Sequence, residues 1–387
     1  MTFIPYSCQN ISEDDIDAVT AVLRSEYLTQ GPATGAFEEA FASRHQVSHA
    51  VAVTNATAGL HIACLALGVG PGSRVWTCPN SFLASANCAL YCGADIDFVD
   101  IDPATRNMGV AALRTKLLRA KDAGTLPAVV IPVDFSGLPC PMQEFRALAD
   151  EFGFRILEDA SHGAGASYRG APVGSRYADI SVFSFHAVKI VTTAEGGMVT
   201  TNDQALAKRL RLLRSHGMTR EPEDLQQPPE GPWVYEQQLL GFNYRMTDVQ
   251  AALGLSQLTR MESLHAQRIA LADVYDDLLG ELPVIRPPRN PESVSSWHLY
   301  VIEIDQARCM VSRAHVFRSL RDAGIGVNVH YIPIHLQPYF RKLGFSAGQF
   351  PNAEAFYARA LTIPLYPALT LAQQQHVVGE LSRALKA

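Results

Sequence analysis

The feature that most constrains the fold of this chain is a regular alternation, over residues 49–201, between short apolar runs rich in β-branched residues and longer stretches with helical periodicity. Strands that alternate with helices predict an α/β fold, in which a mainly parallel sheet carries helices on both faces. The predicted strands are His49–Val53, Arg74–Thr77, Asp95–Val99, Ala128–Val133, Phe154–Leu157, Ile180–Phe185 and Met198–Thr200, and the predicted helices between them are Thr57–Leu67, Leu83–Cys92 and Met142–Phe152.

A proline-rich stretch at 283–291 separates this region from the C-terminal part of the chain. Beyond it, strands are predicted at His298–Ile304 and Gly326–His330 and helices at Arg313–Ala323 and Asn352–Ala360, which indicates a smaller α+β unit. A long helical pattern at Thr247–Leu279 joins the two units. We therefore expect an N-terminal segment and a large α/β domain at 1–245, a connecting helix at 246–280 and a small domain at 281–387.

Charge and length exclude several classes of protein. The chain has 387 residues, with 32 Lys and Arg against 38 Asp and Glu, and the basic residues form no continuous stripe. Proteins that bind nucleic acids concentrate positive charge, so DNA or RNA is not an expected partner. The N-terminus lacks a basic stretch followed by an apolar one, and no run of about 18 apolar residues occurs. We expect a cytoplasmic protein without a membrane segment.

The cysteines and the low fraction of charged residues indicate the compartment and the assembly of the protein. Seven cysteines are scattered along the chain without a CxxC pair, which argues against a disulfide framework and against a zinc site and predicts packing roles in a reducing compartment. Charged residues make up 18% of the chain, below the roughly 25% of an average globular domain. The apolar surface that this leaves predicts an oligomer.

Lys189 is the one lysine of six that lies in apolar surroundings. It follows the predicted strand at 180–185 and has alanine, valine and isoleucine residues on both sides. Loss of hydration favours the neutral amine, which is the nucleophile that Schiff-base chemistry requires. The alternative interpretation is a lysine whose long side chain reaches from a strand end to water.

Asp159 closes the predicted strand that contains FRILED. A carboxylate at the end of a buried strand needs donors or a cation, so Asp159 either caps a helix or pairs with a bound positive group such as a pyridinium nitrogen. Glu158 points in the opposite direction and is predicted to face solvent or a neighbouring loop. His162 follows in the loop, where a histidine is ordinarily a hydrogen-bonded structural residue.

Two further features lie at strand ends. The small residues Asn55, Ala56 and Thr57 lead from a strand into a helix, and free N–H groups at a helix N-terminus form a phosphate site. The alternative is simple capping by Thr54 or Asn55. Phe82 follows another strand and either stacks on a flat ring or packs in the core. Neither GxGxxG nor GxxxxGK[ST] is present, which disfavours dinucleotide and P-loop sites.

A phosphate site, a stacking aromatic ring, a buried carboxylate and a desolvated lysine together suit pyridoxal 5'-phosphate. The sequence also resembles the sugar aminotransferase family of fold-type I pyridoxal-phosphate enzymes, which aminate keto groups of nucleotide-linked sugars. The resemblance spans essentially the whole chain and rests on LTQGPATGAFEEAFA, TNATAGLHIA, PNSFLASANCALYCGA, FVDIDPAT, ILEDASHGAGASY, FSFHAVKIVTTAEGGMVTTND, LRSHGM, GFNYRMTDVQAALGLSQL and SWHLYV.

The resemblance implies roles around the cofactor ring. Lys189 would carry the cofactor as a Schiff base and would move the proton between the cofactor and the sugar carbon. Asp159 would pair with the pyridinium nitrogen. Phe82 would stack on the ring, and His162 would lie beside its phenolate oxygen.

The resemblance also implies a shared phosphate site. Ala56 and Thr57 through their main chain, and Ser184 through its hydroxyl, would hold the phosphate. Asn243 of the partner subunit would complete the site, so the enzyme would be a homodimer. Ala56 and Ala194 stand where the family commonly has glycine, and alanine suits these turns if φ is negative.

Within the family, three stretches resemble the branch that acts in pseudaminic acid biosynthesis: IPYS with LTQG, FSFHAVKIVTTAEGG and VNVHYIPIHLQPYF. This branch implies amino transfer from glutamate to C4 of a UDP-linked 4-keto-6-deoxy-N-acetylhexosamine. Either Arg220 or Arg245 would serve the diphosphate, unless it forms a structural ion pair. The implied sugar-nucleotide contacts are Tyr6, Glu26, Tyr27, Leu28, Thr29, His330, Tyr331 and Ile332.

Other functions remain compatible with the sequence. Enzymes that make viosamine, perosamine or aminoarabinose share the same catalytic residues, so the keto sugar is not determined. Related dehydratases share the fold, although some of them replace the lysine by histidine. A non-catalytic regulator would be expected to carry an additional DNA-binding domain, and a nicotinamide-dependent enzyme would be expected to carry the glycine fingerprint.

Overall fold

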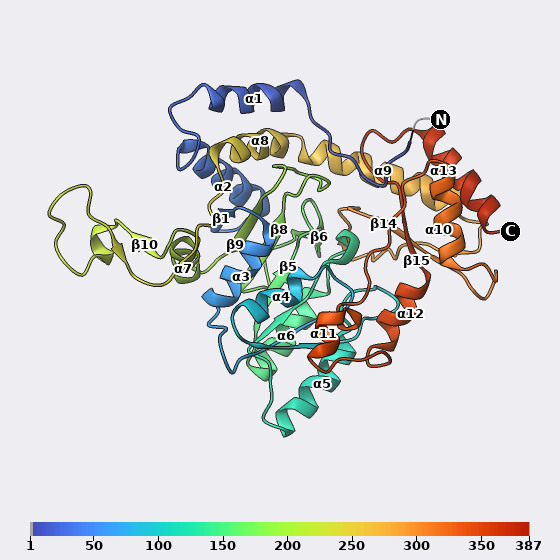
Figure 1. Ribbon diagram of the computed structural model, residues 1–387, viewed down its shortest axis with the longest axis horizontal. Coiled ribbons are helices and arrows are strands. Elements are labelled where there is room, and N and C mark those ends of the chain that lie inside the picture. Colours follow the sequence, from blue (N-terminus) through green and yellow to red (C-terminus); the bar gives the residue numbers. More distant parts are fainter. Residues whose placement is uncertain (1–2, 387) are drawn as a thin grey trace.

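Seven strands form the central sheet in the computed structural model, which describes residues 3–386 (Figure 1). Their order is β1-β9-β8-β5-β4-β2-β3. The five strands from β3 to β8 run parallel, and β9 is antiparallel to both β8 and β1. The predicted mainly parallel sheet is confirmed. The strands are β1 (His49–Val53), β2 (Arg74–Thr77), β3 (Asp95–Phe98), β4 (Val129–Ile131), β5 (Arg155–Asp159), β8 (Ile180–Ser184) and β9 (Gly197–Thr201).

Helices cover both faces of this sheet because alternate side chains of each strand point to opposite faces. Val51 and Val53 belong to a core cluster with α3 and α6, whereas Ala50 and Ala52 belong to a cluster with α2 and α8. The helices of this unit are α2 (Pro32–His45), α3 (Ala56–Ala66), α4 (Ala84–Tyr91), α5 (Val110–Asp122), α6 (Met142–Phe152), α7 (Gln204–Arg214) and α8 (Asp248–Thr259), and α1 (Glu13–Leu23) lies on α8.

The predicted connecting helix is present as two helices, α8 and α9 (Met261–Leu278), which meet at Arg260. The residues after α9 form the smaller unit around an antiparallel sheet in the order β12-β14-β15. This unit contains β12 (Val284–Ile285), β14 (Tyr300–Ile304), α10 (Arg313–Asp322), α11 (Pro338–Lys342), α12 (Pro351–Arg359), β15 (Ala360–Ile363) and α13 (Leu371–Ala384).

Two sequence predictions are wrong in detail. Residues 326–330 do not form a strand, because this segment packs tightly against the N-terminal residues. An added Cβ at Gly326 would lie 2.8 Å from the main-chain nitrogen of Tyr6. The segment makes one bridge, between Asn328 and Thr362, and the Gly326 N–H donates to the Ile4 carbonyl at 2.6 Å. Glu158 does not face solvent: it is buried and its Oε2 accepts a hydrogen bond from Ser181 Oγ at 2.6 Å.

The N-terminal segment and a projecting arm are two further features of the fold. Ile4 packs in the core cluster of the small unit and not against the large sheet, so the boundaries at 245 and 280 stay a prediction. The arm, residues 218–237, carries β10 (Met218–Thr219) and β11 (Glu236–Gln237) and extends away from the large unit (Figure 1, left). Trp233 and Tyr235 are exposed on it. The remaining short strands are β6 (Ser167–Tyr168), β7 (Ala171–Pro172) and β13 (Ser293–Val294).

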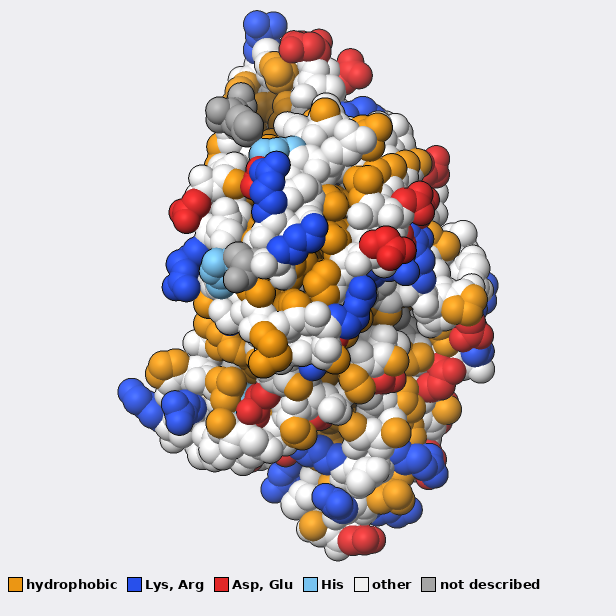
Figure 2. All heavy atoms as spheres, turned by 90° about the vertical axis from the view of Figure 1, so that its right-hand side faces the viewer, with side chains coloured by type: hydrophobic (Ala, Val, Ile, Leu, Met, Phe, Trp, Pro, Cys, Tyr) orange, Lys and Arg blue, Asp and Glu red, His pale blue; other side chains and the backbone are white. Residues whose placement is uncertain are grey.

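The remaining features of the fold are its surface and its cysteines. Figure 2 shows acidic and basic side chains interspersed with apolar ones over the face that carries the small unit. The seven cysteines are free thiols, and five of them are buried. Within residues 3–386, no helix is long and apolar enough to cross a membrane.

The contact between the two units yields a stability prediction. Phe98, at the end of β3, is fully buried and packs edge-on against Phe340 and Phe345 of the small unit. Phe98→Ala should lower the free energy of unfolding by about 3–5 kcal/mol, because the cavity cannot collapse in a packed aromatic cluster. Denaturant unfolding measures this loss. Tyr339→Ala, which removes an exposed ring from α11, is the matched control and should cost less than about 1 kcal/mol. Equal losses would contradict the packing described.

Candidate active site

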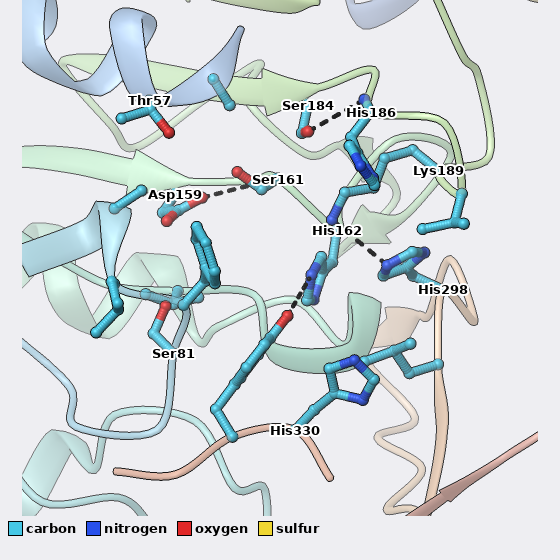
Figure 3. Close-up of a pocket in the computed structure, with 18 of the residues that line it drawn as sticks. Thr57, Ser81, Asp159, Ser161, His162, Ser184, His186, Lys189, His298 and His330 are labelled. Carbon is cyan, nitrogen blue, oxygen red and sulfur yellow. Dashed lines mark hydrogen bonds between the residues drawn. The ribbon is translucent and has the colours of Figure 1, made fainter. Parts of the chain in front are cut away.

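A cavity of about 900 Å³ opens at the carboxyl ends of the parallel strands, between the large sheet and residues 328–332 of the small unit. Carboxyl ends of parallel strands are where α/β proteins bind ligands. Figure 3 shows Thr57, Asp159, Ser184 and Lys189 converging on this cavity from separate segments. The residues of the sequence prediction that line it are Tyr6, Ala56, Thr57, Phe82, Asp159, His162, Ser184, Lys189, His330, Tyr331 and Ile332.

Lys189 lies in the turn after β8 and directs its amine into the cavity. Burial lowers the pKa of this amine to about 7; the carboxylate of Asp159 opposes the shift, and the positive charge of Arg268 contributes to it. Because the shift is downward, the amine is mainly neutral above about pH 7 and protonated below it. Lys189 therefore has the form of a nucleophile near neutral pH, and it is not a lysine reaching to bulk water.

Asp159 ends β5 and is 4% exposed. Its Oδ2 accepts a hydrogen bond from Ser85 Oγ at 2.6 Å, and its Oδ1 accepts one from the main-chain N–H of Ser161 at 3.1 Å. Ser85 Oγ also lies 2.7 Å from Ser81 Oγ. No helix starts at Asp159, so the capping alternative does not apply. The donors hold one carboxylate in a fixed orientation at the cavity wall.

His162 has a defined tautomer. The main-chain N–H of Ser136 donates to its Nδ1 at 3.2 Å, so the ring proton of the neutral imidazole is on Nε2, which faces Tyr331 Oη at 3.4 Å. Burial first, and then the nearby charges of Lys189 and His330, hold the pKa of His162 well below its usual value. The ring therefore acts as a neutral hydrogen-bonding group.

The N-terminus of α3 offers main-chain donors that suit an anion. Asn55 caps this helix, with its Oδ1 accepting from the N–H of Ala58 at 2.8 Å. The N–H groups of Ala56 and Thr57 precede the first intrahelical bond and are free for a ligand by helix geometry. Ser184 ends β8 beside them. Gly197 of β9 packs so closely that an added Cβ would lie 2.7 Å from the Ala56 nitrogen.

Ala194 departs from the expectation of a negative φ. Its φ is +65°, in the left-handed region that favours glycine, whereas Ala56 has helical geometry. The Ala194 N–H donates to Thr192 Oγ1 at 3.0 Å, which holds this turn in place.

Five predicted site residues lie outside the cavity of this chain. Asn243 is exposed and forms a bridge with Ser215. Glu26, Tyr27, Leu28 and Thr29 are exposed beside the start of α8, where Thr29 pairs with Thr247. Within one chain, the structure does not bring these five residues to Lys189.

The cavity also contains residues to which the sequence analysis assigned no role. His298 Nε2 lies 3.4 Å from Lys189 Nζ, and its ring centre is 4.3 Å from that of His162. Asn328, Gln337 and His186 line the cavity as well. His298 stands in SWHLYV, a stretch that carries the resemblance, so its position at the start of a predicted strand was the available signal.

Comparison with known proteins assigns this architecture. Residues 9–382 match the model of the DegT/DnrJ/EryC1/StrS aminotransferase family. The chain belongs to this family. SpsC, a spore coat polysaccharide biosynthesis protein of Bacillus subtilis, is 38% identical over 371 residues, which are 95% of this chain and 93% of SpsC.

Solved structures of family members agree. Helicobacter pylori PseC, an aminotransferase involved in the biosynthesis of pseudoaminic acid, superposes with a TM-score of 0.90 at 30% identity over 100% of both chains. The PLP form of Spr1654 from Streptococcus pneumoniae superposes with a TM-score of 0.88 at 29% identity over 99% of both chains, and a PMP form of it is also known. The protein is therefore a sugar aminotransferase of fold type I that uses pyridoxal 5'-phosphate.

The cavity suits this cofactor. A helix N-terminus and a hydroxyl offer donors to a phosphate, a buried carboxylate can pair with a pyridinium, and a neutral amine can bond to an aldehyde. The close approach of Gly197 to α3 leaves no room for a larger side chain at the anion site. The chain thus contains a group for each part of the cofactor.

This close approach leads to a prediction. Gly197→Ala should displace the first turn of α3 and weaken cofactor binding by about tenfold or more, because the new Cβ meets main-chain atoms that cannot rotate away. Fluorescence titration with pyridoxal 5'-phosphate measures the dissociation constant. Gly70→Ala is the control, since its Cβ would meet no atom within 4 Å. Unchanged cofactor affinity in the Gly197 variant would contradict the anion site.

Proposed function

We propose that this aminotransferase transfers the amino group of glutamate to C4 of a UDP-linked 4-keto-6-deoxy-N-acetylhexosamine, a reaction of the pseudaminic acid pathway. The observation that carries this proposal is the full-length similarity to PseC, with a TM-score of 0.90. The three sequence stretches at the N-terminus, around Lys189 and at 327–340 support the same branch.

We assign the chemistry to residues of the cavity. Bound pyridoxal phosphate supplies an electrophilic carbon and a ring that accepts electrons. Lys189 would hold the cofactor, and as the free neutral amine it would move a proton at the reacting carbon. Asp159, whose carboxylate is fixed by Ser85 and Ser161, would pair with the ring nitrogen.

Other residues of the cavity would hold the cofactor in place. Phe82 would pack on the ring, and His162 would donate from Nε2 to its phenolate oxygen. The N–H groups of Ala56 and Thr57 and the Ser184 hydroxyl would hold the phosphate.

The sugar nucleotide would bind toward the small unit. Tyr6, His330, Tyr331 and Ile332 line that side of the cavity. Among the described residues of the cavity lining, Lys189 is the only lysine or arginine, although a UDP sugar carries two phosphates that need donors. The missing cations support a site completed by a second copy of this chain.

The residues outside the cavity suit such a homodimer. The arm projects with exposed Trp233 and Tyr235 and carries Arg220, and Asn243 follows the arm. In a homodimer the partner subunit's Asn243 would contact the phosphate, and Arg220 or Arg245 would contact the diphosphate. The segment at 26–29 would then reach the nucleotide of the neighbouring site.

A second candidate is amination of another nucleotide-linked 4-keto sugar. The 38% identity to SpsC, whose name places it in spore coat polysaccharide synthesis, favours this candidate. The two candidates share the catalytic residues and differ only in the sugar.

A substrate panel tests the proposed function. The protein, glutamate and a set of UDP- and dTDP-linked 4-keto sugars are incubated, and the products are read by mass spectrometry and NMR. We expect kcat/KM for the UDP-linked 4-keto-6-deoxy-N-acetylhexosamine to exceed that for the others by about tenfold or more, since a pocket that binds an acetamido group discriminates against sugars without it.

The matched control is Lys189→Ala, which should abolish amination of every sugar. Preference for a dTDP-linked sugar would replace the proposed substrate by the second candidate. Loss of water from the sugar without amination would instead indicate a dehydratase.

Subunit mixing tests the shared site. Lys189→Ala and Asn243→Asp chains should each be inactive, the second because a carboxylate would face the phosphate. Coexpression of both chains with different tags should restore about a quarter of the wild-type activity, since half of the dimers are mixed and one of their two sites has both native residues. Activity no higher than that of the separate variants would contradict the shared site.

A further inference from the structure

Arg268 is a fully buried cation beneath the cavity. It lies on α9 and is 1% exposed. Its Nη1 donates to the main-chain carbonyls of Trp297 at 3.1 Å, His298 at 3.3 Å and Leu365 at 3.1 Å. Among the described residues, no carboxylate forms an ion pair with Arg268, and its Nε has no hydrogen-bond partner. The guanidinium is thus held by main-chain dipoles alone.

A buried guanidinium of this kind costs free energy. A charge removed from water requires compensation by an opposite charge or by complete hydrogen bonding, and Arg268 has neither in full. An apolar side chain of similar length would fill the same space at lower cost. A perturbed charge next to a cavity is therefore a candidate for a functional role.

The carbonyls that Arg268 binds belong to the segment that reaches Lys189. Trp297 and His298 immediately precede β14, and the His298 imidazole is 3% exposed. Figure 3 shows the contact between His298 and Lys189, 3.4 Å from Nε2 to Nζ. On the other side, Ser136 Oγ donates to the carbonyl of Leu299 at 2.7 Å. Arg268 and Ser136 together hold this segment from two directions.

We propose that Arg268 is a positioning residue: its guanidinium fixes the main chain at 297–298 so that the His298 imidazole remains against the Lys189 amine, and its charge opposes protonation of that amine. His298 accepts one N–H of the amine and orients it toward the cavity. This inference rests on the proposed role of Lys189 as the reacting amine, but it concerns a residue that touches neither cofactor nor sugar.

The charges around Lys189 support this role. The titratable groups that face its amine are Asp159 from β5, His162 from the following loop, His298 before β14 and His330 from the small unit, with Arg268 behind them. Burial holds the pKa of each of these histidines below its usual value. Asp159 is then the only carboxylate among these groups, and its charge favours the ammonium, whereas Arg268 opposes it.

Site-resolved titration of Lys189 in the full-length protein without cofactor tests the inference. Reductive methylation with formaldehyde and cyanoborohydride modifies only neutral amines, and peptide mass spectrometry follows each lysine separately across a pH series. Wild-type Lys189 should show a midpoint at about pH 7. The other five lysines of the chain are internal controls.

Two variants separate the charge from the rest of the side chain. Arg268→Met should raise the Lys189 midpoint by about one pH unit, because one like charge has been removed from a buried site. Arg268→Lys keeps the charge, so its midpoint should stay below that of Arg268→Met, but it should lower kcat of the loaded enzyme because lysine lacks the planar guanidinium that binds these carbonyls. A wild-type midpoint in a folded Arg268→Met protein overturns the proposal.

A third variant, His298→Phe, tests the proposal if Arg268→Met fails to fold. His298→Phe leaves α9 intact and keeps a packed ring, but it removes the acceptor of the Lys189 N–H. Its midpoint should fall below that of the wild type, because the ammonium loses a hydrogen bond; an unchanged midpoint overturns the proposal. These titrations use no sugar, so they succeed or fail independently of the substrate panel.

Discussion

Removing the Lys189 amine from water costs much more free energy when the amine carries a proton than when it is neutral, and this constraint organises the cavity. Burial lowers the pKa of the amine to about 7, three neutral imidazoles surround it, and Asp159 is the single facing carboxylate that opposes the shift. A surface lysine would remain an ammonium at neutral pH and could not act as a nucleophile. The reactivity of Lys189 therefore depends on the partial burial of its amine in the cavity.

The parallel sheet creates that pocket. Strands β5 and β8 are parallel neighbours that end in Asp159 and Ser184, so these two residues lie together at the carboxyl ends of the strands. The chain after β8 places Lys189 there as well. Strand β9 returns antiparallel and brings Gly197 against the first turn of α3. Residues separated by more than 140 positions in the chain thus meet, because these strands are neighbours in one sheet and bring them to the same end of it. The small unit closes the cavity from the other side with residues 328–332.

Strand periodicity predicted this large sheet well, because a strand buried on both faces leaves a local apolar signature. The end-of-strand residues Asp159 and Lys189 were predictable for the same reason. Contacts between segments that show no local periodicity could not be predicted from the sequence. Residues 326–330 have the composition of a strand but meet a neighbouring segment, and Glu158 reaches a serine on the adjacent strand. The left-handed φ of Ala194 follows from its surroundings and not from its own preference.

The amino-acid sequence by itself determined the class of fold, the family and the set of groups that the cofactor requires, because these depend on local patterns and on motifs that remain recognisable in one chain. Only the tertiary structure decided which groups touch. In the folded chain, His298 contacts Lys189 and Arg268 is buried behind them. Asn243 and residues 26–29 lie outside the cavity of their own chain. The reason is physical: desolvation and electrostatic coupling depend on distances between segments far apart in the chain, which no local pattern encodes.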